Sequence, residues 1–154
     1  MPSPRFTHSS LRQLLLALIV IGIVGMEVEL AFLRHADSAS QWIPHVTLFI
    51  GLLTTAAVYI RPERGTLRAF QAMMIIFIAV GGLGVFFHLQ GNVEFALERD
   101  PSLSGVGLLW KALRGASPAL APGALAQLGL LGLLYSYRHP ALARDSTIRP
   151  DNVD

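Results

Sequence analysis

The stretch LLLALIVIGIVGMEVELAFL, Leu14–Leu33, is apolar apart from two glutamates, Glu27 and Glu29. Its length matches the roughly 20 residues that a helix needs to cross the hydrocarbon core of a bilayer. An ionisable side chain inside such a span costs about 2.5–3.5 kcal/mol at the helix centre on insertion scales, so it usually has a partner or a role. The stretch predicts a membrane-spanning helix and directs attention to its glutamates.

Three further apolar runs give the rest of the fold. The chain has 154 residues, of which 53% are hydrophobic and only 14% are charged. Soluble domains carry about 25% charged residues. We predict an all-α integral membrane protein, a four-helix bundle with spans at 14–33, 43–60, 70–89 and 119–137. A single membrane domain then covers 1–140, and we expect the polar tail 141–154 to be disordered.

The distribution of basic residues predicts the topology, since loops on the cytoplasmic side carry an excess of Lys and Arg. With both termini cytoplasmic, eight of the 12 basic residues fall inside and four fall outside. The inside set is Arg5, Arg12, Arg61, Arg64, Arg68, Arg138, Arg144 and Arg149, and the outside set is Arg34, Arg99, Lys111 and Arg114. We therefore expect a multi-pass protein of the cell membrane, which is the cytoplasmic membrane in a prokaryote.

A cleaved signal peptide is the alternative interpretation of the first span. Arg5 and Arg12 precede the apolar stretch, and the mostly small residues 36–40 follow it. The apolar stretch is longer than the core of a typical signal peptide and contains two glutamates. Both features favour a retained membrane helix.

The outer connection 91–117 is too long for a simple turn. Asn92 is placed to cap a short helix that runs to Arg99 and is broken by Asp100-Pro101. A second helix is predicted from Ser104 to Gly115, with apolar residues at helical spacing. Its Trp110 lies beside basic residues, a pattern typical of a helix on the membrane surface, here the outer one. An ordinary ordered loop is the alternative.

Most of the unusual polar groups fall at one depth, on the outer side. This outer cluster consists of Glu27, Glu29, His35, His45 and His88, followed along the chain by Asn92, Glu94 and Glu98. Glu27 and Glu29 point about 200° apart on a helix, so one face cannot hold both. Glu29 shares its face with Gly22 and Gly25, and His88 repeats this spacing with Gly81 and Gly84. Small residues allow helices to approach closely, so we expect Glu29 and His88 to face the bundle interior.

Three interpretations of the outer cluster stay open. Imidazoles and carboxylates bind divalent transition metals, which points to Glu29, His45 and His88, with Glu27, His35 and Glu94 as weaker candidates. His45 and His88 are also the one pair placed to ligate a b-type haem. The third interpretation is a hydrogen-bonded rim of polar helix ends. Separately, we expect Glu27 to pair with Arg34, seven residues on and on the same helix face, and Gln127 in the fourth span to make an interhelical hydrogen bond.

Residues and motifs that are absent from the sequence exclude several classes of function. It contains no cysteine, which excludes disulfides, thiolate-bound zinc and iron–sulfur clusters. No phosphate-binding loop, nucleophile elbow, zinc-protease motif or basic aromatic stretch for nucleic acid is present. We expect a non-enzymatic or accessory membrane subunit. Its partners are the lipid bilayer and either other membrane subunits or further copies of itself. The alternatives are a metal- or haem-binding, redox-active membrane protein and a small transporter that acts as an oligomer.

Overall fold

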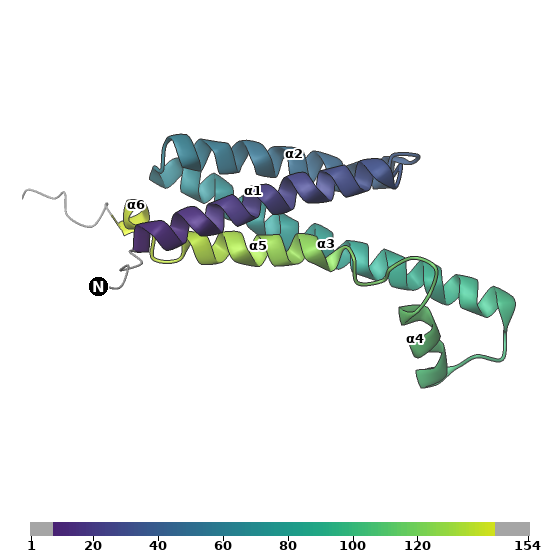
Figure 1. The fold of residues 1–154 in the computed structure, drawn as a ribbon. Helices are drawn as coiled ribbons and strands as arrows, with labels where there is room; N and C mark the ends of the chain where they lie inside the picture. The colour runs from purple at the N-terminus through teal and green to yellow at the C-terminus, as the bar shows by residue number, and fades with distance from the viewer. Residues whose placement is uncertain (1–7, 144–154) are drawn as a thin grey trace, which may run out of the picture.

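The computed structural model describes residues 8–143, and all the regular structure in this range is helical (Figure 1). Three helices, α1, α2 and α3, are long and apolar enough to cross a membrane. The predicted all-α fold is thus confirmed, and the three long apolar helices are compatible with a membrane helical bundle. The helices are α1 (His8–Phe32), α2 (Ala39–Ile60), α3 (Arg64–Arg99), α4 (Gly105–Leu113), α5 (Gly123–Ser136) and α6 (Pro140–Ala143).

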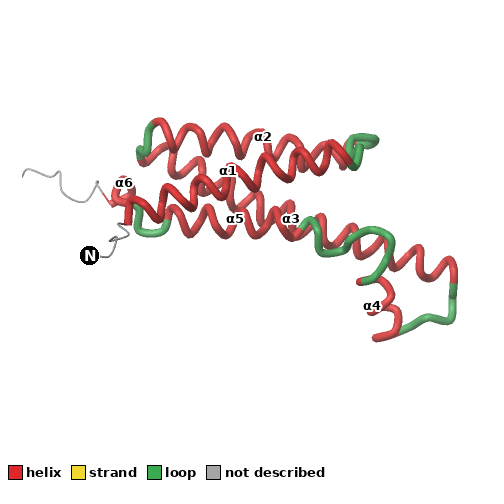
Figure 2. The backbone as a smooth tube through the Cα atoms, viewed as in Figure 1, coloured by secondary structure: helices red, strands yellow, loops and turns green. Residues whose placement is uncertain are grey.

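Four of the helices pack side by side as a ring. The backbones of α1 and α3 each approach both α2 and α5, whereas the diagonal pairs α1–α3 and α2–α5 make no close backbone approach. Figure 2 shows the same arrangement, with short loops between α1, α2 and α3. The core of the ring is built from large apolar side chains, of which the most buried are Ile19, Ile23, Leu48, Leu67, Phe70, Met74 and Phe77.

The contact between α3 and α5 depends on glycine. A Cβ added to Gly81 would lie 2.6 Å from the Ala126 nitrogen, and one added to Gly129 would lie 2.5 Å from the Met74 carbonyl oxygen. Both distances are shorter than real Cβ atoms make, so only glycine allows these two backbones to approach. The expectation that Gly81 marks a close helix contact is confirmed.

The start of α1 and the end of α5 lie at the same end of the ring, which we call the terminal end. There the Arg12 guanidinium donates a hydrogen bond of 3.1 Å to the Arg138 carbonyl oxygen, which ties the start of α1 to the turn after α5. The opposite end carries the α1–α2 loop and α4, and we call it the α4 end (Figure 1). The helices α1, α2, α3 and α5 therefore run alternately between the two ends.

The third predicted span and the short helix predicted after it are one continuous helix. The helix α3 has 36 residues, about 54 Å at 1.5 Å per residue, whereas the prediction covered 70–89 and a separate helix from Asn92. Asn92 is not a cap, because it lies buried inside α3. The Gln90 amide donates to Glu94 at 3.0 Å, four residues on, which supports the helix where a break was expected. The helix ends at Arg99, directly before Asp100-Pro101, as predicted.

The fourth predicted span is shorter than expected. Residues 119–122 form turns, and α5 contains only 14 residues. Pro118 and Pro122 flank these turns, and the main-chain bonds there join residues three apart, such as Ala121 N to Pro118 O at 3.2 Å. At about 21 Å, α5 alone is shorter than the roughly 30 Å of a hydrocarbon core.

The other helix boundaries differ less from the predicted ones. The helix α2 begins at Ala39, four residues before the predicted span, because Ser38 and Gln41 form a capping box. Of the tail 141–154, which was predicted to be disordered, residues 141–143 belong to α6, and the rest lies outside the described residues.

Candidate functional site at the α4 end

The predicted outer cluster lies at the α4 end, but its members divide into separate contacts. Glu27 and His45 form one pair, between α1 and α2. His35, in the α1–α2 loop, and His88, in α3, form a second contact between their rings. Among residues 8–143, no group of three or more His, Asp or Glu side chains is placed to hold a metal ion.

Glu27 and His45 form a close acid–imidazole pair between α1 and α2. The His45 Nδ1 lies 2.7 Å from Glu27 Oε1, and His45 Nε2 lies 2.9 Å from the His35 carbonyl oxygen. A carbonyl oxygen can only accept, so Nε2 must carry a proton. The bond between Nδ1 and Oε1 then needs one further proton, on either atom. With it the pair has no net charge, which suits a site between two apolar helices.

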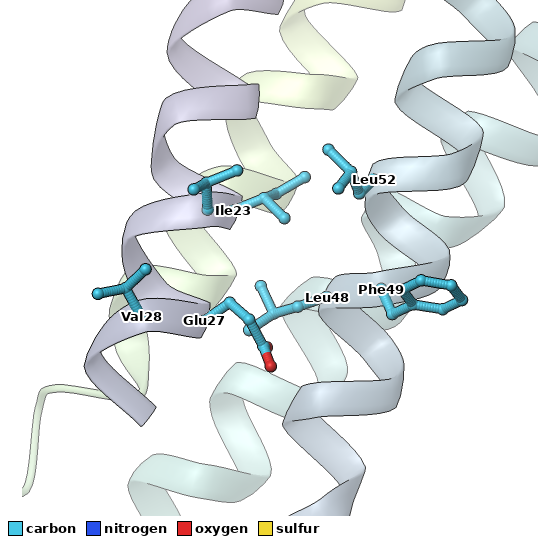
Figure 3. A pocket seen from close by; sticks show the side chains of 7 residues that line it. Ile23, Glu27, Val28, Leu48, Phe49 and Leu52 are labelled. Carbon is cyan, nitrogen blue, oxygen red and sulfur yellow. The ribbon is translucent and has the colours of Figure 1, made fainter. Parts of the chain in front are cut away.

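The second oxygen of Glu27 has a different environment. Glu27 Oε2 is occluded and has no hydrogen-bond partner among the described residues. Glu27 also lines a groove of about 170 Å³ between α1 and α2. The other side chains that line this groove are apolar: Ile23, Val24, Val28, Leu48, Phe49 and Leu52. Figure 3 shows Glu27 among them. Glu27 thus has one carboxyl oxygen bonded to His45 and the other without a partner.

His35 connects the α1–α2 loop to α3. Its ring centroid lies 6.4 Å from that of His88, and the planes are tilted by 46°. Burial lowers the pKa of the His35 imidazole, and the nearby rings of His88 and His45 lower it further. Asp37 acts in the opposite direction. His35 is therefore held mainly as the neutral imidazole, the form that can bind a metal.

His88 and Trp42 bind main-chain carbonyl groups at the same end. His88 Nδ1 lies 3.3 Å from the Pro118 carbonyl oxygen, in the turns before α5. The Trp42 indole donates a hydrogen bond of 3.2 Å to the carbonyl oxygen of Ala36 in the α1–α2 loop. The centroid of the Trp42 ring lies 5.5 Å from that of the His45 ring. These contacts fix the loops against the helices.

A second polar site, centred on Asn92, was not predicted. The Asn92 amide donates to the Ala112 carbonyl oxygen at 2.9 Å and to the Ser117 carbonyl oxygen at 2.7 Å. Its own oxygen accepts from the Ser117 backbone nitrogen at 3.1 Å. Asn92 thus holds the segment between α4 and α5 against α3. Gly115 packs directly on this amide, where a Cβ would overlap it.

Two expectations about the glutamates are wrong. The Glu29 side chain is exposed and makes no hydrogen bond or ion pair with any described residue, so it does not face the bundle interior. Glu27 pairs with His45 rather than with Arg34. The rotation of α1 explains both results. Ile19 and Ile23 are buried, and Glu27 lies four residues beyond Ile23 on the same face, which turns Glu29 outward.

The remaining candidates are accounted for individually. Glu94 is exposed and accepts a hydrogen bond from Gln90. His45 already uses both ring nitrogens, so a metal or a haem iron could bind it only by displacing Glu27 or the His35 carbonyl group. Gly25, expected beside a neighbouring helix, has open space around it.

Comparison of the chain with protein family models, with characterised proteins and with solved structures finds no match.

Proposed function

We propose that the chain is a non-enzymatic, accessory protein of the cell membrane. In this account α1, α2, α3 and α5 cross the bilayer, both termini are cytoplasmic, and α4 lies on the outer membrane surface. The observation that carries the proposal is the use of polar groups at the α4 end. His45, His88 and Asn92 bind main-chain atoms that hold loops and helices together.

The return of the chain supports four crossings. The helix α3 leads from the terminal end to the α4 end, and α5 brings the chain back along α3 to the terminal end (Figure 1). At the terminal end, the hydrogen bond from Arg12 to Arg138 joins the start of α1 to the turn after α5. The short α5 is compatible with a crossing because the turns at 119–122 and Tyr137 lengthen its apolar segment.

The exposed surface of the bundle supports a lipid environment. Large apolar side chains are exposed along α1, α2 and α3, among them Leu18, Ile21, Phe49, Leu53, Ile75 and Phe86. An apolar surface of this extent is unusual for a protein in water. The basic residues then favour the terminal end as the cytoplasmic side.

The environment of α4 supports a position on the membrane surface. In Figure 1, α4 runs across the long axis of the bundle, near the level of the α1–α2 loop. Its Ala112 is fully buried against α3, whereas Val106 and Trp110 are 83% and 61% exposed. The Arg114 guanidinium lies 5.8 Å from the centre of the Trp110 ring, a pairing suited to the headgroup region.

Depth-dependent quenching of Trp110 fluorescence in vesicles tests the position of α4. The other tryptophan, Trp42, is first replaced in a Trp42→Phe variant, and the bonds of Asn92 stay unchanged. We expect a blue-shifted emission that is quenched most strongly by lipids labelled near the headgroups. Emission typical of water, with no quenching by labelled lipids, would contradict the surface position.

A metal-binding role is the second candidate, and one observation favours it. The ring centroids of His35 and His88 lie 6.4 Å apart, and the His35 side chain has no hydrogen-bond partner among the described residues. Metal analysis and an absorption spectrum of the purified protein test this role. Stoichiometric metal that is lost in a His88→Ala variant would support it, and a Soret band would indicate haem.

A further inference from the structure

We propose that two copies of this chain associate in the membrane through the outward face of α5, with the two Gln127 side chains hydrogen-bonded to each other. The inference rests on the proposed four-span topology, because only a crossing α5 places Gln127 in hydrocarbon. Gln127 lies in the middle part of α5, it is exposed, and its amide makes no hydrogen bond with any described residue.

Gln127 differs in this respect from polar side chains that the apolar helices turn inward. The Gln71 amide in α3 donates to Ser136 Oγ at 3.2 Å, and the Thr55 hydroxyl in α2 donates to the Gly51 carbonyl oxygen at 2.7 Å. The fold thus provides partners for the polar groups that it turns inward. In hydrocarbon no water can replace the missing partner of Gln127, so a partner from another molecule is favoured.

The surroundings of Gln127 form a stripe suited to a helix contact. Ala124, Gln127, Leu130 and Leu134 follow one another at steps of three, three and four residues, and all four are exposed. Residues at this spacing lie on one face of a helix. The opposite face, with Leu125 and Gly129, is buried against the bundle. The stripe combines a small residue, one amide and two leucines.

The chemistry of the amide favours a second copy as the occupant. A primary amide is self-complementary, since each Gln127 can donate its N–H to the carbonyl oxygen of the other. Two copies inserted with the same topology carry Gln127 at the same depth. A two-fold axis along the membrane normal would bring the two α5 helices together in parallel and make both hydrogen bonds equivalent. A single polar residue in an apolar stripe also fixes the register of such a pair.

Cross-linking in membranes tests the dimer, because the chain has no cysteine of its own. In an Ala124→Cys variant of the full chain, we expect a disulfide-linked dimer to form upon mild oxidation. The matched control is Ala79→Cys, at an exposed position of α3, which should stay monomeric. Adding Gln127→Leu to Ala124→Cys should weaken association about sevenfold, the effect of two membrane hydrogen bonds of average strength. Replacing Gln127→Leu by Gln127→Asn, which keeps the amide, should restore most of the association.

Different results would contradict the dimer proposal and the four-span topology on which it rests. A Gln127→Cys variant should resist a water-soluble maleimide from both sides of the membrane. If this cysteine is labelled, the four-span proposal fails. If it is shielded but Ala124→Cys gives no dimer, or gives equal dimer with and without Gln127→Leu, the dimer proposal alone fails. Cross-linking of Ala124→Cys to a different protein would also overturn it.

Discussion

Two polar sites hold the α4 end of the molecule together, and they use different chemistry. Asn92 is a buried neutral amide whose three hydrogen bonds all reach main-chain atoms. Glu27 and His45 form an ionisable pair that shares one proton and leaves Glu27 Oε2 without a partner. The comparison indicates that the Asn92 site is a fixed structural tie, whereas the pair depends on its proton. The following predictions test this difference.

Loss of the Asn92 amide should have the largest effect. In an Asn92→Leu variant, the Ala112 carbonyl group loses one of its hydrogen bonds in a buried place, and the two partly buried bonds to the Ser117 main chain are lost as well. We expect a loss of about 2–4 kcal/mol in the stability of the α3–α4 contact. Hydrogen exchange of residues 105–117 in detergent measures it. Gln90→Ala, an exposed change two residues away, is the control and should leave this exchange nearly unchanged.

The two glutamates of α1 should respond very differently to the same change. Glu27→Leu leaves His45 Nδ1 without a partner and should cost about 1–3 kcal/mol in thermal unfolding in detergent. Glu29→Leu removes an exposed side chain that has no partner and should cost almost nothing. Glu27→Gln keeps a donor toward Nδ1 and should lie near the unmodified protein. Equal effects of the two leucine variants would contradict the assigned pair.

A smaller effect should appear in the pH dependence of stability. Because the pKa of His35 is lowered in the folded protein, the unfolded chain binds its proton more readily. Stability should be complete above the ordinary histidine pKa of about 6.5 and should fall as the pH drops through that value. A His35→Asn variant should lose less stability between about pH 8 and about pH 5 than the unmodified protein. Thermal unfolding at both pH values measures this difference, and an identical loss in the two proteins would exclude His35 as its source.

The sequence predicted the helices better than it predicted their contacts. Long apolar runs located α1, α2 and α3, and Asp100-Pro101 located the end of α3, because these signals act locally along the chain. The role of Asn92 could not be predicted, since an asparagine that caps a helix and one that binds a distant backbone have the same local sequence. The role of Asn92 depends instead on the segment between α4 and α5, where Gly115 leaves room for the Asn92 amide.

The choice between Glu27 and Glu29 failed for a related reason. In the first span almost every residue is apolar, so the sequence carries little information about which face is buried. The glycine spacing favoured Glu29, yet Gly25 borders open space and only Gly22 packs against α5. The packing of Ile19 and Ile23 in the core sets the rotation of α1 and selects Glu27.

The most direct test of the account is whether α5 crosses the membrane. Single cysteines at Ser3, Ser38, Ser104 and Asn152 can be labelled with an impermeant reagent, because the chain has no other cysteine. The account predicts labelling of Ser38→Cys and Ser104→Cys in intact cells, and of Ser3→Cys and Asn152→Cys only after the membrane is permeabilised. Labelling of Ser104→Cys and Asn152→Cys from the same side would contradict four crossings, and labelling of Ser3→Cys in intact cells would contradict the orientation.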